Sequence, residues 1–194
     1  QQNRLESLTA TRLKGHLTKH LRKQFGQVTL PGFAFVNHHL AHAVMAYFHS
    51  GMDEALVLTI DGSGEWVTTA WWHGHGGTLD LLHEVKTPHS LGWFYSAFTE
   101  YLGFEAYDGE YKVMGLAAYG KPDSSIERLL QKVIWYDGEG GLGSDPTILA
   151  MGPRTRSDYF PDSLIEHMGR DPRAKSEEIG EWHINLAYGV QQRL

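Results

Sequence analysis

The clearest strand of the sequence is Ala55-Leu56-Val57-Leu58-Thr59-Ile60, which runs directly into Asp61-Gly62-Ser63-Gly64-Glu65. Its residues are apolar or β-branched, and the glycines behind it indicate a turn. A second strand is expected at Val67–Trp72 and a third at Leu79–Lys86, with the turn Gly74-His75-Gly76-Gly77 between them. Because only short turns separate the three strands, the sequence predicts a three-stranded meander.

Helices are expected on both sides of this meander. The charged, periodic stretch from Arg4 to Phe25 predicts a helix that stops at Gly26, and Asn37 is a good N-cap for a helix from His38 to Ser50. Further helices are expected at 91–102, 111–119, 125–134 and from 176 onward, whereas residues 137–161 are expected to be irregular. This mixed order predicts an α/β or α+β fold and does not fit a Rossmann repeat.

Two finer expectations concern packing. The apolar run Phe33–Val36 follows Pro31-Gly32 and predicts a short buried strand. On the helix that comes next, the packed side is expected to consist of Ala41, Val44, Met45 and Phe48.

The composition is that of a globular protein, with 41% hydrophobic and 21% charged residues among 194. The absence of cysteine excludes a disulfide framework and a cysteine-based zinc site. The net charge of −6 argues against a nucleic-acid surface, and no apolar run is long enough for a membrane span. We therefore expect a cytoplasmic protein without a nucleic-acid or membrane partner.

The two ends of the chain predict a piece of a larger protein. The first residue is not Met, and the polar start Gln1-Gln2-Asn3-Arg4 shows no signal peptide. The last expected helix ends without a capping residue. Residues 1–194 are therefore expected to form a single fragment.

The strongest chemical signal is Asn37-His38-His39-Leu40-Ala41-His42. On a helix, His38 and His42 lie one turn apart on the same face, so both imidazoles can bind one metal ion. His39 lies about 100° away round the helix and fits a supporting or substrate-contacting role better. The alternative is an ordinary surface cluster, because the chain has 12 histidines.

A second signal is the Asp-Gly-Ser-Gly-Glu turn after the buried strand. Asp61 would add an oxygen ligand to the two histidines, and the backbone N–H groups of Gly62, Ser63 and Gly64 could approach phosphate oxygens. The alternative is an ordinary Asp-Gly turn between two strands. In a third segment, Gly109–Pro122, Lys112 in the first turn of a helix suggests an anion site, although close helix packing is the commoner explanation of such a segment.

Four motifs together resemble the N-terminal region of the O-carbamoyltransferases of nodulation-factor and antibiotic biosynthesis. They are Asn37–Ala43, Asp61–Glu65, Ser90–Tyr95 and Gly109–Ala117, in this order. The resemblance extends from about residue 33 to 122 and continues weakly into the last helix.

The resemblance implies a fold of the actin/hexokinase/Hsp70-like ATPase superfamily, similar to the enzymes that attach threonylcarbamoyl to tRNA adenosine. It places the metal ligands on His38, His42 and Asp61, with iron (Fe²⁺) as the metal and Mg²⁺ or Zn²⁺ as alternatives. A second aspartate and an opening hairpin with a His-Asp motif would lie outside this chain. A YrdC-like domain in the same full-length protein would make carbamoyl-adenylate from carbamoyl phosphate and ATP.

The implied reaction moves the carbamoyl group to a hydroxyl of a small-molecule or sugar acceptor while AMP leaves. Within this sequence His39 is the candidate general base, and Lys112 is a candidate partner of phosphate charge. Two alternatives remain open, a tRNA threonylcarbamoyl-transferase-like enzyme and a non-catalytic, metal-stabilised binding module. A metal-dependent hydrolase is less well supported, because neither a His-Glu-x-x-His motif nor a nucleophile signature is present.

Overall fold

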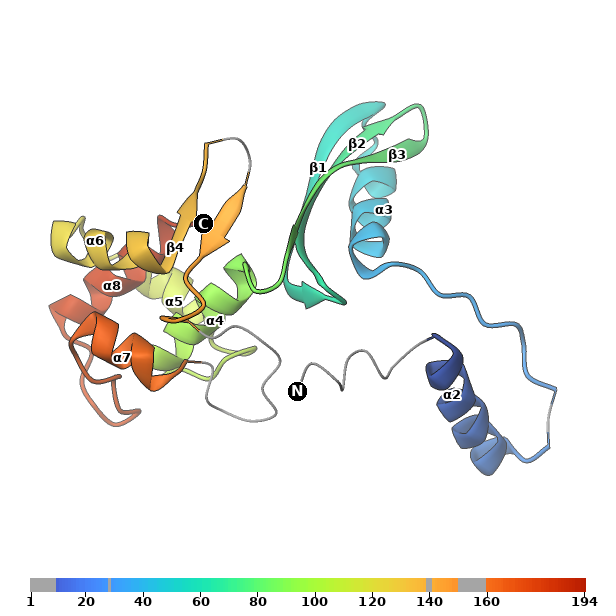
Figure 1. Ribbon diagram of the computed structural model, residues 1–194, viewed down its shortest axis with the longest axis horizontal. Coiled ribbons are helices and arrows are strands. Elements are labelled where there is room, and N and C mark those ends of the chain that lie inside the picture. The colour runs from blue at the N-terminus through green and yellow to red at the C-terminus, as the bar shows by residue number, and fades with distance from the viewer. Residues whose placement is uncertain (1–9, 28, 139–140, 150–159) are drawn as a thin grey trace.

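The computed structural model describes residues 10–27, 29–138, 141–149 and 160–194. Along the chain it contains α2 (Ala10–Phe25), α3 (His38–Ser50), β1 (Glu54–Gly64), β2 (Val67–His75), β3 (Thr78–Lys86), α4 (Leu91–Tyr101), α5 (Glu110–Ala117), α6 (Ser124–Val133), β4 (Ile134–Tyr136), β5 (Leu142–Ser144), α7 (Asp162–Met168) and α8 (Glu181–Gln191). Figure 1 shows α3 against the sheet of β1–β3, a bundle formed by α4–α8, and α2 apart from both. The fold is thus mixed α and β, with helices flanking a three-stranded sheet, as predicted.

The sheet is an antiparallel meander in the order β1-β2-β3. Its second turn is two residues long, because His75 pairs with Thr78 and both Gly76 and Gly77 have positive φ angles, as a type I′ turn requires. The register of β1 against β2 shifts between Ile60 and Gly64. Such a bulge bends a strand and redirects its side chains.

Helix α3 packs on one face of this sheet. Ala43 and Tyr47 of the helix form a small core with Val57, Ala70 and Trp72 of the strands. Gly74 permits the close approach, because a Cβ there would lie 2.6 Å from Cδ2 of Tyr47. The opposite side of β1 is open to solvent, with Leu56, Leu58 and Ile60 all exposed.

The larger core lies among the helices of the α4–α8 bundle. Nearly all of α4 is buried, and its aromatic residues Phe94, Phe98 and Tyr101 are inaccessible to solvent. α4 also packs against β1 and β2, so it joins this core to the sheet. In the part of the chain that the structure describes, no helix has the length and apolar character needed to cross a membrane.

The packed side predicted for α3 was wrong. Val44, Met45 and Phe48 are exposed, whereas His39, Ala43 and Tyr47 are buried. The structure buries the more polar side because its polar atoms have partners: the Tyr47 hydroxyl, for example, donates to the carbonyl of Asp53 at 2.8 Å. A buried polar group with a hydrogen bond escapes most of the desolvation cost, so an apolar pattern alone does not identify the packed side.

The strand predicted at Phe33–Val36 is also absent. The segment has no regular structure, and Phe35 and Val36 are 47% and 62% exposed. No described strand pairs with it. Without a neighbouring strand, its backbone N–H and C=O groups are left to form hydrogen bonds with water.

Other boundaries differ by smaller amounts. The expected irregular stretch contains β5, which pairs with β4, and the last helix begins at Glu181 rather than near residue 176. Helix α7 was not predicted. The predicted helical residues 4–9, and residues 150–159 of the irregular stretch, lie outside the described residues.

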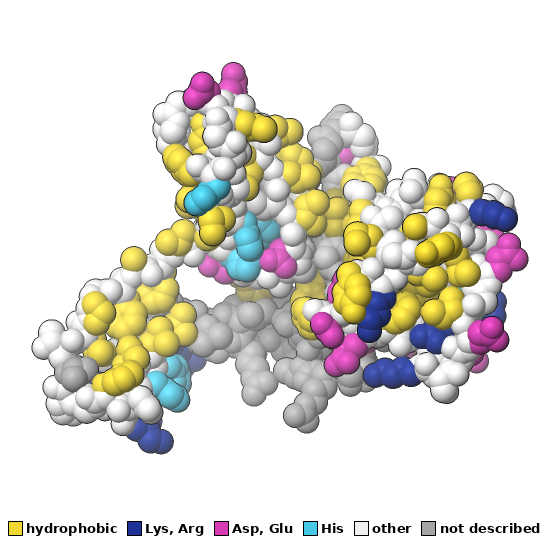
Figure 2. Space-filling view, turned by 180° about the vertical axis from the view of Figure 1, so that it is seen from behind, with side chains coloured by type: hydrophobic (Ala, Val, Ile, Leu, Met, Phe, Trp, Pro, Cys, Tyr) yellow, Lys and Arg dark blue, Asp and Glu magenta, His cyan; other side chains and the backbone are white. Residues whose placement is uncertain are grey.

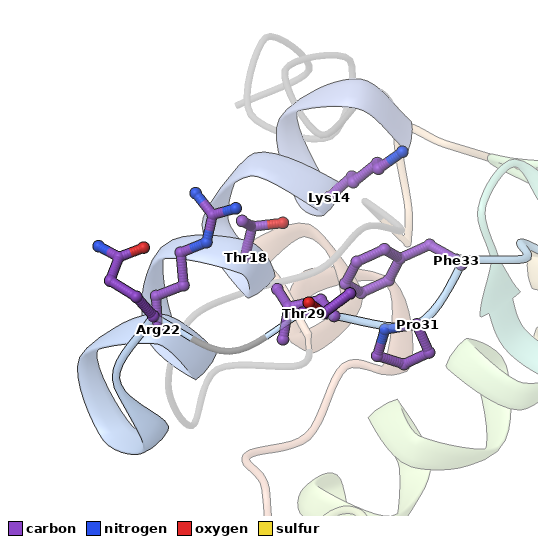
Figure 3. A pocket seen from close by; sticks show the side chains of 9 residues that line it. Lys14, Thr18, Arg22, Thr29, Pro31 and Phe33 are labelled. Carbon is purple, nitrogen blue, oxygen red and sulfur yellow. The ribbon is translucent and has the colours of Figure 1, made fainter.

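Hydrophobic side chains gather on the visible face of each of the three parts (Figure 2). Beside α2, a groove of ≈ 620 Å³ is lined by Lys14, Thr18 and Arg22 of the helix and by the extended segment 29–33. Figure 3 shows Lys14, Thr18 and Arg22 on the helix and Thr29, Pro31 and Phe33 on the segment beside it. None of the residues predicted to bind metal or phosphate lines this groove.

We expect Gly120→Ala to destabilise the α4–α8 bundle. A Cβ at Gly120 would lie 2.6 Å from the carbonyl oxygen of Ile184 on α8. The segment after α5 must therefore move away from α8, at a cost of about 1–3 kcal/mol. Gly115→Ala is the matched control, because nothing lies within 4 Å of that position and alanine favours the helix by about 0.5–1 kcal/mol. Thermal unfolding followed by circular dichroism measures both changes. An equal midpoint for the two variants would contradict the expected crowding.

Candidate metal centre

The first turn of α3 carries the two histidines that were predicted to bind metal. The Asn37 side chain accepts a hydrogen bond from the Leu40 N–H at 2.9 Å, which caps the helix and starts it at His38. His42 follows one turn later, and the two rings lie edge to face with their centres 4.6 Å apart. The local sequence therefore fixes both imidazoles on one side of the helix.

Asp61 meets these imidazoles from the end of β1. Its Oδ2 lies 2.7 Å from Nε2 of His38 and 3.6 Å from Nε2 of His42, and the two Nε2 atoms are 3.1 Å apart. Among the described residues this is the one group of histidine and acidic side chains whose ligand atoms all lie within 4.8 Å of one another. The structure thus brings together the three predicted ligands.

One proton on Nε2 of His38 cannot make two full hydrogen bonds, one to Asp61 and one to His42. If Nε2 of His38 carries a proton and donates it to Asp61, it has no lone pair to accept a bond from His42. If it is unprotonated, its lone pair faces the carboxylate. Ligands at about 2.1 Å from one cation lie on the order of 3 Å apart, close to the separations observed here. The three residues therefore fit a divalent cation, which would accept one lone pair from each.

The site is open on one side. The side chains of His38 and Asp61 are 41% and 39% exposed, and that of His42 is 57% exposed. An ion held by these three groups would keep open positions toward solvent. A structural metal site is usually closed by four protein ligands, whereas a catalytic site keeps positions for substrate.

The bulge in β1 is what brings Asp61 to the helix. Asp61, Gly62 and Ser63 lie opposite the single residue Thr68 of β2, so they leave the regular ladder. Oδ1 of Asp61 accepts a hydrogen bond from the N–H of Gly62 at 2.7 Å. Burial acts to raise the pKa of Asp61, but the hydrogen bonds from His38 and Gly62 outweigh it and lower that pKa. The carboxylate is therefore ionised and available as a ligand.

Two glycines of the predicted phosphate-binding turn have different surroundings. Gly64 lies directly against the His38 ring, and a Cβ there would be 2.6 Å from Cγ of that imidazole. The Gly62 N–H already donates to Asp61, so it must change partner before it can bind a phosphate oxygen. Ser63 lies outside the β1–β2 ladder.

The N-terminus of α4 holds this turn, a contact that was not predicted from the sequence. The buried Ser90 hydroxyl caps α4 by accepting from the Trp93 N–H, and it lies 2.7 Å from the Gly62 carbonyl and 3.2 Å from the Asp61 carbonyl. Gly92 makes the approach possible, because a Cβ there would lie 2.6 Å from the Asp61 carbonyl carbon. The serine before the predicted helix at 91–102 was the available signal, but its long-range bonds are not readable from sequence.

His39 points away from the open side. It is 1% exposed, its Nε2 lies 2.9 Å from the Val67 carbonyl, and its Nδ1 lies 2.8 Å from Oγ1 of Thr59. Burial lowers the pKa of His39, although the bond to Val67 acts in the opposite direction. The role of general base stays a prediction, and these bonds weigh against it because both ring nitrogens are engaged.

Lys112 does not join the group. It is exposed on α5, and its ammonium lies 5.6 Å from the centre of the Tyr111 ring. Within the described part of the chain it makes no hydrogen bond or ion pair with His38, His42 or Asp61. Its predicted contact with phosphate therefore has no support from these contacts.

We expect Gly64→Ala to weaken binding of divalent metal about 10–100-fold, because the added methyl group displaces the His38 imidazole. Isothermal titration of the purified chain with Zn²⁺ or Co²⁺ measures the change, and Gly115→Ala again serves as the control. Unchanged metal affinity in Gly64→Ala would show that His38 is not held as a ligand in this position.

Comparison with known proteins identifies what this chain is similar to. The family model described as carbamoyltransferase N-terminus matches residues 6–139. An uncharacterised protein of Synechocystis sp. is 55% identical over 165 residues, which cover 84% of this chain and 26% of that protein. Nodulation protein NolO of Bradyrhizobium diazoefficiens is 43% identical over 105 residues, covering 54% of this chain and 19% of that protein. Nodulation protein NolNO of Sinorhizobium fredii is 42% identical over 103 residues, covering 53% and 15%.

The chain therefore matches between 15% and 26% of the length of these relatives. The family match, by contrast, extends over well more than half of the chain itself. It confirms the resemblance that the four motifs indicated. The chain belongs to the carbamoyltransferase family and carries part of its N-terminal region.

Proposed function

We propose that this chain carries the metal-binding part of an O-carbamoyltransferase active site. The observation that carries the proposal is the convergence of His38, His42 and Asp61 on one point that is open to solvent. Two imidazoles and one carboxylate with open positions form the ligand set typical of non-haem Fe²⁺ sites. Zn²⁺ accepts the same ligands, whereas Mg²⁺ prefers oxygen ligands, so iron is the first choice.

The proposed reaction transfers a carbamoyl group from carbamoyl-adenylate to an acceptor hydroxyl. The hydroxyl oxygen forms a bond to the carbamoyl carbon, the bond from that carbon to the phosphate oxygen breaks, AMP leaves, and a base takes the hydroxyl proton. A bound divalent cation would withdraw charge from the phosphate oxygens and so make AMP a better leaving group.

The residues of the chain contribute mainly by position. The bulge holds the Asp61 carboxylate, ionised, against the imidazoles, and it also takes Gly62 and Ser63 out of the strand ladder. The backbone N–H groups of Gly62, Ser63 and Gly64 are the proposed cradle for the adenylate phosphate. Lys112 is the proposed partner of phosphate charge, which requires α5 and the bulge to face the same ligand.

The wider setting is also a proposal. We infer that residues 1–194 are a piece of a domain of the actin/hexokinase/Hsp70-like ATPase fold. A YrdC-like domain of the same full-length protein would supply the carbamoyl-adenylate from carbamoyl phosphate and ATP. The reaction would take place in the cytoplasm with a small-molecule or sugar acceptor and without a nucleic-acid partner.

A tRNA acceptor is the second candidate, and α2 is the observation that favours it. This helix carries Arg12, Lys14, Lys19, Arg22 and Lys23 and no acidic residue, and two of these cations line the groove of Figure 3. Such a surface suits a phosphate backbone. The net charge of −6 for the whole chain argues the other way. Salt-dependent binding of tRNA would favour this candidate over a small-molecule acceptor.

We expect His42→Ala to abolish stoichiometric metal uptake, because one imidazole and one carboxylate bind a cation much more weakly than three ligands. Changes to groups that merely support a ligand already cost about 10–100-fold in affinity. Elemental analysis after loading with Fe²⁺ under anaerobic conditions measures the loss. His49→Ala is the matched control, since His49 lies exposed at the other end of α3. Equal metal content in both variants would refute the proposed centre.

The isolated chain is expected to yield no carbamoylated product from carbamoyl phosphate, ATP and a sugar acceptor, because we propose that a separate YrdC-like domain makes the carbamoyl-adenylate. The full-length protein is expected to turn over, and its Asp61→Asn variant to lose activity at least about tenfold. Product is measured by mass spectrometry. Turnover by the isolated chain would contradict the proposal that a YrdC-like domain must supply the carbamoyl-adenylate. Metal binding in the full-length protein without nucleotide binding would favour a non-catalytic, metal-stabilised module.

A further inference from the structure

His39 occupies a position that the proposed reaction does not use. It is buried between α3 and the sheet, one residue after the ligand His38. Its two ring nitrogens contact two different strands: Nδ1 lies 2.8 Å from the Thr59 hydroxyl on β1, and Nε2 lies 2.9 Å from the Val67 carbonyl on β2. Hydrogen bonds to two strands indicate that the His39 side chain does more than fill space.

The two contacts bracket the bulge that carries Asp61. Thr59 precedes the register shift between Ile60 and Gly64, and Val67 is the residue that pairs with Gly64 after it. One imidazole therefore ties the strand that enters the bulge to the strand that follows it. It also ties both strands to the helix that carries His38 and His42.

The contact with Val67 determines that Nε2 carries a proton. The Val67 carbonyl can only accept, so Nε2 of His39 carries the proton and donates it. When the ring is neutral, Nδ1 accepts from the Thr59 hydroxyl, whose other neighbour is the more distant Ala70 carbonyl at 3.4 Å. In this tautomer His39 has no lone pair left for the hydroxyl proton of an acceptor.

We propose that His39 is a positioning residue that fixes α3 against the bulge, so that the His38 and His42 imidazoles meet the Asp61 carboxylate. The inference rests on the proposed metal centre. Rotation or sliding of α3 breaks both bonds of His39 and carries the two ligand imidazoles away from Asp61. A small displacement of this kind is enough to disturb a metal site, whose ligands must be held within about half an ångström.

Three variants of the purified chain test the proposal. His39→Leu fills the space without hydrogen bonds, and His39→Gln can still donate to the Val67 carbonyl from the position of Nε2. Thr59→Val keeps the shape of the threonine side chain and removes only the hydroxyl that Nδ1 uses. His49→Gln is the control on the same helix, because His49 is exposed and, among the residues that the structure describes, its side chain bonds only to the Met45 carbonyl one turn back.

Binding of Co²⁺ gives the first measurement, with affinity from chelator competition and ligand geometry from the visible absorption spectrum. We expect His39→Leu to bind at least about tenfold more weakly with an altered spectrum, and Thr59→Val to show a smaller loss. His39→Gln should recover most of the affinity, and His49→Gln should match the unchanged protein. Circular dichroism identifies a variant that does not fold. If His39→Leu fails to fold, the comparison of Thr59→Val and His39→Gln with the control decides.

A metal-free measurement separates this inference from the proposed function. Long-range ¹H–¹⁵N correlation spectra of the histidine rings should show His39 as a single Nε2–H tautomer with a slowly exchanging proton. If the unchanged chain binds no Co²⁺ but shows this tautomer, the proposed metal centre is refuted and the positioning role of His39 is retained. An averaged tautomer, or Co²⁺ binding by His39→Leu and Thr59→Val as tight as in the unchanged protein, overturns the role of His39.

Discussion

Asp61 reaches the two imidazoles only because β1 leaves its ladder for three residues. In a regular strand, successive side chains alternate between the two faces, and the backbone amides are used by the neighbouring strand. At the bulge opposite Thr68 the regular alternation is lost, so the carboxylate turns toward α3 and the Gly62 N–H donates to that carboxylate. The chemistry proposed for this chain depends on that irregularity.

Two buried side chains hold the irregular segment from opposite directions. Ser90, at the start of α4, contacts the carbonyls of Asp61 and Gly62, and His39, in α3, contacts the strands on either side. Both use polar atoms that cannot reach water, so releasing either contact leaves a buried group unpaired. The cost of an unpaired buried polar group is about 1–3 kcal/mol, which is sufficient to hold a short segment in one conformation.

The sequence was informative where the signal was local. Helical spacing put His38 and His42 on one face, the Asn37 cap set the start of the helix, and β-branched runs located the meander. Predictions from the sequence were wrong where the local structure depended on contacts with residues far along the chain. The packed side of α3 was misassigned because His39 and Tyr47 are satisfied by groups far along the chain or beyond the helix end. The short strands β4 and β5 were missed because three residues each give too little pattern in a glycine-rich stretch.

The exposed apolar residues of β1 affect how the chain behaves in solution. β1 is an edge strand in the described part of the fold, and Leu56, Leu58 and Ile60 project from it into water. An apolar strand with unpaired backbone donors and acceptors is a template for pairing with another polypeptide. We expect the isolated chain to self-associate through β1 at high protein concentration wherever nothing else covers that edge.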